Sequence, residues 1–547
     1  MSSQIVYENR NSNVGLGETI RFQVPASVAI LNSAECYLRF NMVVGVKGAQ
    51  TLAVSDEADV NHYFPWTLGK GGASNLIRNL TIRANGKIIE QITDYNRLNR
   101  VLCNYVENSS QSHLKQLYEG SDTDYVASVN TLTRRPIDDA GASTQGLSQE
   151  NMECEICLPL RLSGVFNNSQ PFPNGLAPIE CEILLEENVY NVIHAQSFQL
   201  GADAPNFKGS KNVQSVGVGY INDTMPYKAE GTPNGAGQTS IKLLNVTNGG
   251  NNVFNSGNVS VTDIMKHPFF NGMTCVVEGT NNIEVTVDTI QVTNNQIELN
   301  FAATDFTGNV VPNPKVYIKV GAGGVLPTAP TITLSEMQLV VGTVDASPAQ
   351  LSALQAAKNS SNGYGYTYKS YGDFPVNMSS GALVVSNLVN CKYQMAKSIL
   401  SFWENTGDAK LVNKDNLLCD VSTEVNPKSY QYKLHSLMVP NRSISLSQYI
   451  RTRSQPGGWS AGHIKELSQS LACCGYKTKD LSNIDGCLLV GRGLVPGDSG
   501  YTHSFADNDE IRLNMQFAAQ SQNLLQHNFV CHNKSFVIKQ SGSFVVE

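Results

Sequence analysis

The residues with the clearest catalytic precedent are Gly497-Asp498-Ser499-Gly500, which match the nucleophile motif of chymotrypsin-like serine proteases. A serine hydroxyl is a weak nucleophile until a histidine accepts its proton and a carboxylate orients that histidine. Those proteases continue the motif with Gly-Pro, whereas Tyr501 and Thr502 follow here, and no Ala-Ala-His-Cys block lies upstream. We therefore interpret residues 496–500 as a tight turn and expect Ser499 to be catalytically silent.

Three other groups of residues could do chemistry, but the sequence does not supply their partners. Gly69-Lys70-Gly71-Gly72 lacks the spacing and the Lys-Ser/Thr pair of a phosphate-binding loop. Glu186-Glu187 ends an apolar strand without an obvious partner carboxylate, so we interpret it as a solvated strand end. The nine histidines form no HExxH pattern. We therefore expect no catalytic, cofactor-binding or metal-binding residue.

The twelve cysteines offer one close pair, the CxxC of Cys154 and Cys157. This pair lies in an expected strand, Met152 to Leu160, where residues three apart point to opposite faces, so zinc chelation is not expected. Other cysteines sit singly within apolar runs: Cys36, Cys103, Cys181, Cys275 and Cys531. We interpret the cysteines as reduced and buried in a protein that folds inside a cell.

Composition indicates an all-β protein of more than one domain. The 547 residues exceed what one hydrophobic core usually organises, charged residues make up only 16%, and turn-forming residues are plentiful. A net charge of −7, without a basic arm, argues against wrapping nucleic acid. The first residues do not have the pattern of a secretory signal, and no apolar run is long enough to span a bilayer.

The stretch from Ala73 to Val106 predicts a β-hairpin followed by a short helix. Asn85-Gly86 supplies the positive-φ pair of a type I′ turn, and Lys87 to Ile92 forms the returning strand. Asp94 can then cap a helix. Its apolar residues have the spacing i, i+3, i+4 and i+7, namely Leu98, Val101, Leu102 and Tyr105.

The rest of the chain predicts further strands and two further helices. One helix begins at Ser347-Pro348 by the cap-then-proline rule, and the other runs from Leu388 to Trp403, where apolar residues have helical spacing. The main expected strands are Glu18–Pro25, Cys36–Val44, Met152–Leu160, Pro178–Ile193, Thr331–Val344, Tyr430–Val439, Gly486–Val490, Glu510–Ala518 and Ser535–Val546.

These elements divide the chain into two β-sandwich domains. The first is expected at residues 1–350 and is interrupted by an inserted β subdomain at 197–327, where short β-like runs alternate with Asn-Gly turns. A linker is expected at 351–364, and the second domain at 365–547.

Several blocks of the sequence resemble the double jelly-roll major capsid proteins, most closely those of virophages and Polinton-like viruses, in the lineage of adenovirus hexon and tailless-phage capsids. The blocks are spread over most of the chain, at residues 75–98, 156–187, 332–344, 391–405 and 429–449. Residues 197–327 do not match clearly.

The resemblance implies two eight-stranded antiparallel jelly rolls and a structural role. Three chains would form a pseudo-hexameric capsomer that tiles an icosahedral shell, with penton and minor capsid proteins as further partners. It implies assembly inside an infected cell, residence in the virion capsid, no cofactor and no sequence-specific binding of nucleic acid. A glycan-binding or adhesin-type jelly roll is the alternative, since lectins share this architecture. A protease built on residues 497–500 is the weakest choice.

Overall fold

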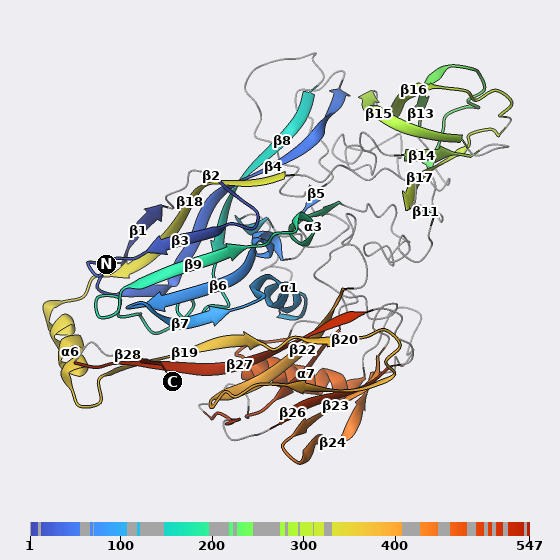
Figure 1. Cartoon of the computed structure of the whole chain (residues 1–547). Coiled ribbons are helices and arrows are strands. Elements are labelled where there is room, and N and C mark those ends of the chain that lie inside the picture. Colours follow the sequence, from blue (N-terminus) through green and yellow to red (C-terminus); the bar gives the residue numbers. More distant parts are fainter. Residues whose placement is uncertain are drawn as a thin grey trace.

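A computed structural model describes residues 2–8, 13–54, 66–68, 71–106, 118–120, 147–195, 218–221, 227–243, 274–278, 283–293, 296–309, 311–321, 331–406, 427–446, 460–478, 488–496, 501–505, 510–517, 523–540 and 544–546. Antiparallel β-sheet dominates these residues (Figure 1). Among the described helices, none combines the length and apolar character that crossing a bilayer requires.

The first half of the chain builds a sandwich of two antiparallel sheets. One sheet has the order β1-β18-β4-β8, with β2 paired to β18 beside β1; the other has the order β3-β9-β6-β7. The strands are β1 Ser2–Glu8, β2 Asn13–Gly15, β3 Thr19–Gln23, β4 Leu31–Val54, β6 Ile77–Ala84, β7 Lys87–Ile92, β8 Leu147–Pro159, β9 Ile179–Leu185 and β18 Thr331–Val344.

The second half repeats this plan. Its sheets have the orders β19-β27-β22-β25 and β21-β26-β23-β24, with β20 and β28 also paired to β27. The strands are β19 Tyr364–Asp373, β20 Val376–Met378, β21 Val384–Val389, β22 Ala396–Asn405, β23 Pro427–Leu434, β24 Leu437–Ser445, β25 Leu489–Gly493, β26 Ile511–Phe517, β27 Leu524–Ile538 and β28 Phe544–Val546.

Both halves have jelly-roll topology. We count β1 with β2 as one interrupted strand, and β19 with β20 as another, so that each half has eight main strands. In each half one sheet then has the order first, eighth, third and sixth strand. The second, seventh, fourth and fifth strands form the facing sheet in both halves. This order identifies a jelly roll, so the expected all-β double jelly roll is confirmed.

The expected hairpin and the helix after it are confirmed. Strands β6 and β7 are joined by Asn85 and Gly86, with φ of 49° and 76°, as a type I′ turn requires. The helix α1 (Tyr95–Val106) follows, and its predicted apolar stripe is buried. The Tyr105 hydroxyl accepts a hydrogen bond from the Leu489 backbone N–H at 3.1 Å, so α1 also contacts the second half through β25.

The helix expected from Leu388 to Trp403 is wrong, because the segment begins with the end of strand β21 and its second half is strand β22. Its side chains alternate between two apolar layers: Leu400 and Phe402 join the core of the first sandwich, whereas Ile399 and Trp403 lie in the core of the second. A strand buried on both faces reads as a continuous apolar run, which periodicity alone does not distinguish from a helix.

The helix of the second half lies elsewhere, at α7 (Ala461–Cys473). The Ser460 hydroxyl caps it by accepting the His463 N–H, and Gly475 follows it with φ of 77°. Like α1, it follows the fifth strand of its jelly roll. The serine N-cap and the glycine after the last turn are sequence signals that could have predicted this helix.

Of two other expected elements, one is confirmed and one is wrong. The helix at Ser347-Pro348 is confirmed as α6 (Pro348–Asn359), with a full capping box between Ser347 and Gln350. The single strand from Tyr430 to Val439 is wrong, because the chain turns at His435, whose φ is 53°, and returns as β24.

Further strands lie between β9 and β18, the seventh and eighth strands of the first jelly roll. They are β11 Val218–Ile221, β12 Tyr227–Lys228, β13 Gln238–Lys242, β14 Thr274–Val277, β15 Ile283–Thr293, β16 Gln296–Thr304 and β17 Lys315–Gly321. Strand β15 joins the first jelly roll through a short parallel pairing with the end of β4. Shorter elements near the first sandwich are β5 Trp66–Thr67, η1 Gly72–Leu76, α3 Val189–Val192 and β10 His194–Ala195.

The second half lies below the first in Figure 1, with β7 next to β19, and one sheet of the second half is covered on both faces. We call β19, β20, β22, β25, β27 and β28 the shared sheet. One face packs on β21-β26-β23-β24, whereas the other faces the first sandwich and α7. On this second face Phe172 of the first sandwich lies against Tyr366 and Phe536, at ring-centroid distances of 5.2 Å and 5.8 Å. One apolar core therefore runs from the first sandwich onto the shared sheet.

One close approach between the two halves depends on a glycine. A Cβ added at Gly164 would lie 1.9 Å from the carbonyl oxygen of Lys369 on β19. Because that oxygen belongs to backbone held in a ladder, it has little freedom to move aside.

We expect Gly164→Ala to lower the free energy of unfolding by about 1–3 kcal/mol, the usual cost of overpacking. Gly365→Ala is the matched control, because Gly365 lies on β19 and an added Cβ meets nothing within 4 Å. Urea unfolding monitored by tryptophan fluorescence compares the two variants. Equal midpoints would contradict the close approach.

Candidate functional site

Charged side chains from both sandwiches meet where α1 faces the shared sheet. We call this group the interlock cluster. It consists of Asp94, Arg97, Glu186, Asp373, Glu404 and His527. The turn before α1, α1 itself and the end of β9 supply the first three, and β19, β22 and β27 supply the others.

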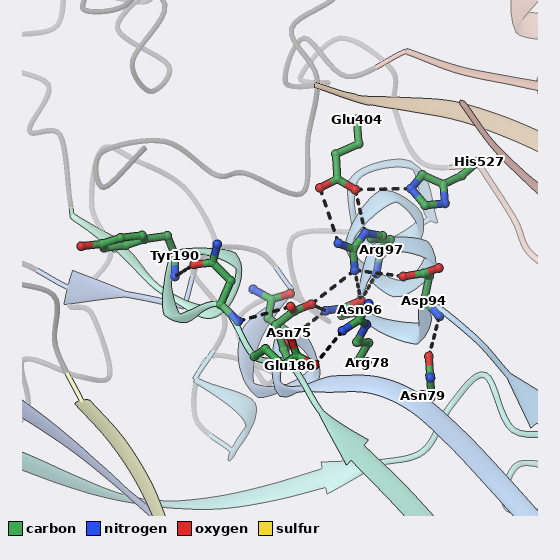
Figure 2. Close-up of polar contacts among 12 residues, drawn as sticks. Asn75, Arg78, Asn79, Asp94, Asn96, Arg97, Glu186, Tyr190, Glu404 and His527 are labelled. Carbon is green, nitrogen blue, oxygen red and sulfur yellow. Dashed lines mark hydrogen bonds and ion pairs between the residues drawn. The ribbon is translucent and has the colours of Figure 1, made fainter. Parts of the chain in front are cut away.

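Arg97 lies at the centre of the cluster (Figure 2). Its Nε donates to Oε2 of Glu404 at 2.7 Å, and its Nη1 lies 3.0 Å from Oδ1 of Asp94 and 3.3 Å from Oε2 of Glu186. Asn96 also donates to Glu186, at 2.8 Å. The Glu186 and Glu404 side chains are each only 4% exposed. One guanidinium therefore joins carboxylates that are far apart in the sequence and belong to different jelly rolls.

His527 extends the cluster across the shared sheet. Its Nδ1 lies 2.7 Å from Oδ2 of Asp373, and its Nε2 lies 3.3 Å from Oε2 of Glu404. The second oxygen of Asp373 accepts the Asn528 backbone N–H at 3.1 Å. Glu404 thus accepts from Arg97 of the first sandwich and faces His527 of the second, which makes it the link between the two halves.

The carboxylates of the cluster favour the positively charged forms of His527 and Arg97. Burial alone lowers the pKa of His527, but the hydrogen bonds and charges of Asp373 and Glu404 outweigh burial and raise the pKa to about 9. Burial likewise lowers the pKa of Arg97, and the carboxylates of Glu404, Asp94 and Glu186 outweigh it and raise that pKa. His527 is therefore an imidazolium at neutral pH, and both of its ring nitrogens donate hydrogen bonds.

Asp94, Asp373 and His527 are the described residues that could hold a metal ion, since their ligand atoms all lie within 4.8 Å of one another. Protein groups already engage each of them. Arg97 pairs with Asp94, and His527 and Asn528 donate to the two oxygens of Asp373. A divalent ion would have to displace the proton between His527 and Asp373. We therefore interpret the cluster as an ion-pair network that joins the jelly rolls.

A second buried carboxylate supports the same joint. Glu90 on β7 has no exposed surface and accepts hydrogen bonds from the Ser163 hydroxyl and the Gly164 backbone N–H, at 2.5 Å and 2.8 Å. Burial raises its pKa above the ordinary value, and these hydrogen bonds oppose the rise. On the neighbouring residue, the Ile89 carbonyl accepts the Tyr368 hydroxyl of β19. The edge strand β7 is thereby fastened to the shared sheet.

The motifs that the sequence singled out have different outcomes. Residues 497–500, with Ser499, lie outside the described residues, as do Gly69 and Lys70. The solvated strand end expected at Glu186-Glu187 is right for Glu187, whose side chain is 69% exposed and pairs with Arg78, and wrong for Glu186. Sequence reasoning missed Glu186 because its partner Arg97 comes 89 residues earlier in the chain.

The described cysteines are free thiols, and most of them are buried. Cys154 and Cys157 both lie on β8 and are half-buried. Cys154 packs against the first core and its Sγ donates to the Met42 carbonyl, whereas Cys157 lies near the charges of Glu155 and Arg39. The two thiols have different surroundings, as expected for residues three apart on a strand.

We expect Arg97→Met to lower the free energy of unfolding by about 3–5 kcal/mol, because it leaves Glu186 and Glu404 buried without a cation. Urea unfolding measures the change. Arg39→Met is the control, since Arg39 pairs with Glu155 at the surface, where both side chains are about half exposed. That variant should unfold at the wild-type midpoint. An Arg97 variant as stable as the Arg39 variant would contradict the role of the cluster.

The cluster also predicts a loss of stability at alkaline pH. The pKa of His527 rises from 6.5 in the unfolded chain to about 9 in the folded one, so its stabilisation is fully present below 6.5 and disappears as pH rises through 9. The amount is about 3 kcal/mol. We expect the difference in unfolding free energy between wild type and His527→Gln to shrink from about pH 6 to about pH 10. A difference independent of pH would show that folding leaves the pKa of His527 unshifted.

Comparison with known proteins gives matches by structure. No family model matches the chain, and no curated protein sequence matches it. The Faustovirus major capsid protein resembles it with a TM-score of 0.51 and 7% identity, over 98% of this chain and 90% of that one. A chain of the Sputnik virophage gives a TM-score of 0.47 at 8% identity, over 100% and 88% of the two chains.

The mavirus major capsid protein gives a TM-score of 0.42 at 10% identity, over 100% of this chain and 90% of that one. At such identities the likeness concerns the fold, and the argument depends on the Faustovirus protein and on the strand order. Together they identify this chain as having the double jelly-roll fold that is found in viral major capsid proteins.

Proposed function

We propose that this chain is the major capsid protein of a virus and that three copies form a pseudo-hexameric capsomer that tiles an icosahedral shell. The observation that carries the proposal is the repeated jelly-roll order in one chain, with the two copies joined through a buried shared sheet. The likeness to the Faustovirus major capsid protein, over nearly the whole of both chains, supports it.

The joint between the jelly rolls suits such a role. A single chain that holds two similar sandwiches in a fixed relation presents two similar units to its neighbours. Three such chains around a threefold axis give six units, and a closed ring prevents open-ended growth through the same contacts. The interlock cluster and the continuous core would keep the two units from turning against each other when neighbours press on them.

We place the first jelly roll at residues 1–350, with its insertion at 197–327, the linker at 351–364 and the second jelly roll at 365–547. In a jelly roll, successive loops emerge from alternating ends. The insertion connects the seventh and eighth strands and therefore shares an end with the connection between the fifth and sixth strands, which carries α1. We propose that this end forms the outer face of the shell, where an insertion extends into solvent.

The proposal includes a purely structural role, without catalysis or a cofactor. Its partners are further copies of the chain, penton proteins and minor capsid proteins. It also places folding and assembly inside an infected cell and the mature protein in the virion.

Analytical ultracentrifugation of the purified full chain tests the proposal, and we expect a compact homotrimer at micromolar concentration. Negative-stain images of the same material should show pseudo-hexagonal particles. A stable monomer that binds glycans on an array would instead favour the adhesin-type alternative. A stable monomer without such binding would also contradict the capsid role.

A further inference from the structure

Two cysteines meet in a second buried cluster on the face of the shared sheet that α7 covers. Cys474 caps the C-terminal end of α7, and Cys531 lies in the middle of β27. Both are free thiols without exposed surface, and both belong to the core that joins the two halves. Neither takes part in the interlock cluster.

The strand register and the helical repeat bring the two thiols together. Cys531 is paired with Ser398 of β22, and the Ser398 hydroxyl lies 2.7 Å from the hydroxyl of Ser470 on α7. Cys474 comes one helical turn after Ser470, so it projects over the same part of the sheet. Its thiol accordingly hydrogen-bonds with both Ser398 and Cys531.

Lys369 and Lys397 lie near this pair, and the pKa values of the two thiols shift in opposite directions. Lys369 donates from Nζ to the Cys474 carbonyl. Burial raises the pKa of Cys531, but the hydrogen bond from Cys474 and the charges of Lys369 and Lys397 outweigh it and lower the pKa below its ordinary value. Burial raises the pKa of Cys474 well above its ordinary value. Since the thiolate is the reactive form, the nearby lysine charges favour Cys531 as the nucleophile and Cys474 as the partner that resolves.

We propose that Cys474 and Cys531 are a disulfide-forming site, which a small hydroperoxide oxidises so that α7 becomes covalently tied to β27. In the first step the Cys531 thiolate attacks one peroxide oxygen; the S–O bond forms, the O–O bond breaks, and hydroxide leaves and takes up a proton. In the second step the Cys474 sulfur attacks the sulfenic acid; the S–S bond forms, the S–O bond breaks, and water leaves with the Cys474 proton. Two thiols are oxidised, and one hydroperoxide is reduced.

We expect an oxidant to reach the site when the last turn of α7 opens, because this turn lies next to exposed chain. Gly475 beside Cys474 is exposed, and Tyr476 is half-buried. Because the sulfurs are fully buried when the turn is closed, the reaction is slow and the product is protected from reductants.

The neighbouring Cys473 provides a matched control. Its Sγ donates to the Val495 carbonyl at 3.0 Å, so it points away from Cys531 although it is adjacent in the sequence. A disulfide that depends on geometry forms from Cys474 and leaves Cys473 reduced.

The test treats the purified full chain with hydrogen peroxide and maps its peptides without reduction. We expect a linked peptide that joins Cys474 to Cys531 and a loss of two hydrogens from the intact mass. The melting temperature should rise by roughly 4 °C, because the bond closes a long loop of the unfolded chain, and dithiothreitol added after unfolding should reverse the rise. Cys474→Ser and Cys531→Ser should abolish the linked peptide, and Cys473→Ser should retain it.

A linked peptide that contains Cys473, or both thiols remaining unmodified after incubation at a temperature where α7 opens, would overturn the proposal. Oxidation of Cys531 to the sulfinic acid without a linked peptide would also overturn it. If a serine variant does not fold, the peptide map of the wild-type protein alone shows whether a disulfide joins Cys474 to Cys531. None of these outcomes depends on whether the chain forms a capsomer.

Discussion

The structure depends on one sheet that is apolar on both of its faces. Along β27 ten of the fifteen residues are buried, because alternate side chains enter the core of the second sandwich and the core shared with the first. If the first sandwich were absent, Leu400, Phe402 and Phe529 would form an exposed apolar surface, which water disfavours in proportion to its area. We infer that the second jelly roll depends on the first for its stability and that the two halves unfold together.

The interlock cluster lies at this apolar contact and fixes the relative orientation of the two halves. Apolar contacts are not directional, so they hold two layers together without fixing their relative rotation. Ion pairs at 2.7 to 3.3 Å fix it, because Arg97 reaches Glu404 and Glu186 together in one arrangement. Such buried ions cost much solvation free energy, and an apolar replacement of equal volume is often as stable. We infer that the cluster is retained for the geometry of the joint.

The two jelly rolls share a strand order and differ in their connections. In both, the link after the fifth strand carries a helix, α1 or α7, and both helices contact the shared sheet. The link between the seventh and eighth strands is long in the first half and carries β11 to β17, whereas only a short connection separates β26 from β27 in the second. The sheets preserve the framework, and the loops make the halves different.

The sequence by itself determined the turns and helix ends that depend on a few neighbouring residues. The pair Asn85-Gly86 required a type I′ turn, and Ser347-Pro348 required the start of a helix, because a backbone angle or a cap is decided within a few residues. The all-β class followed from alternating strands and turn-rich composition, and the two jelly rolls were implied by the resemblance of several blocks to the double jelly-roll capsid proteins. The cap and trailing glycine of α7 were equally local signals, although the apolar spacing of β22 suggested a helix in the wrong place.

Only the tertiary structure decided which face each apolar residue covers and which charges meet. The segment around Ile399 could be a helix or a strand with two buried faces until the first sandwich was seen to lie on it. Arg97 and Glu404 are 307 residues apart, and neither carries a local sign of the other. Their meeting follows from the packing of one jelly roll on the other, which depends on long-range burial. Pairs that form by such packing leave no spacing in the sequence, and this is why the turns could be predicted and the interlock cluster could not.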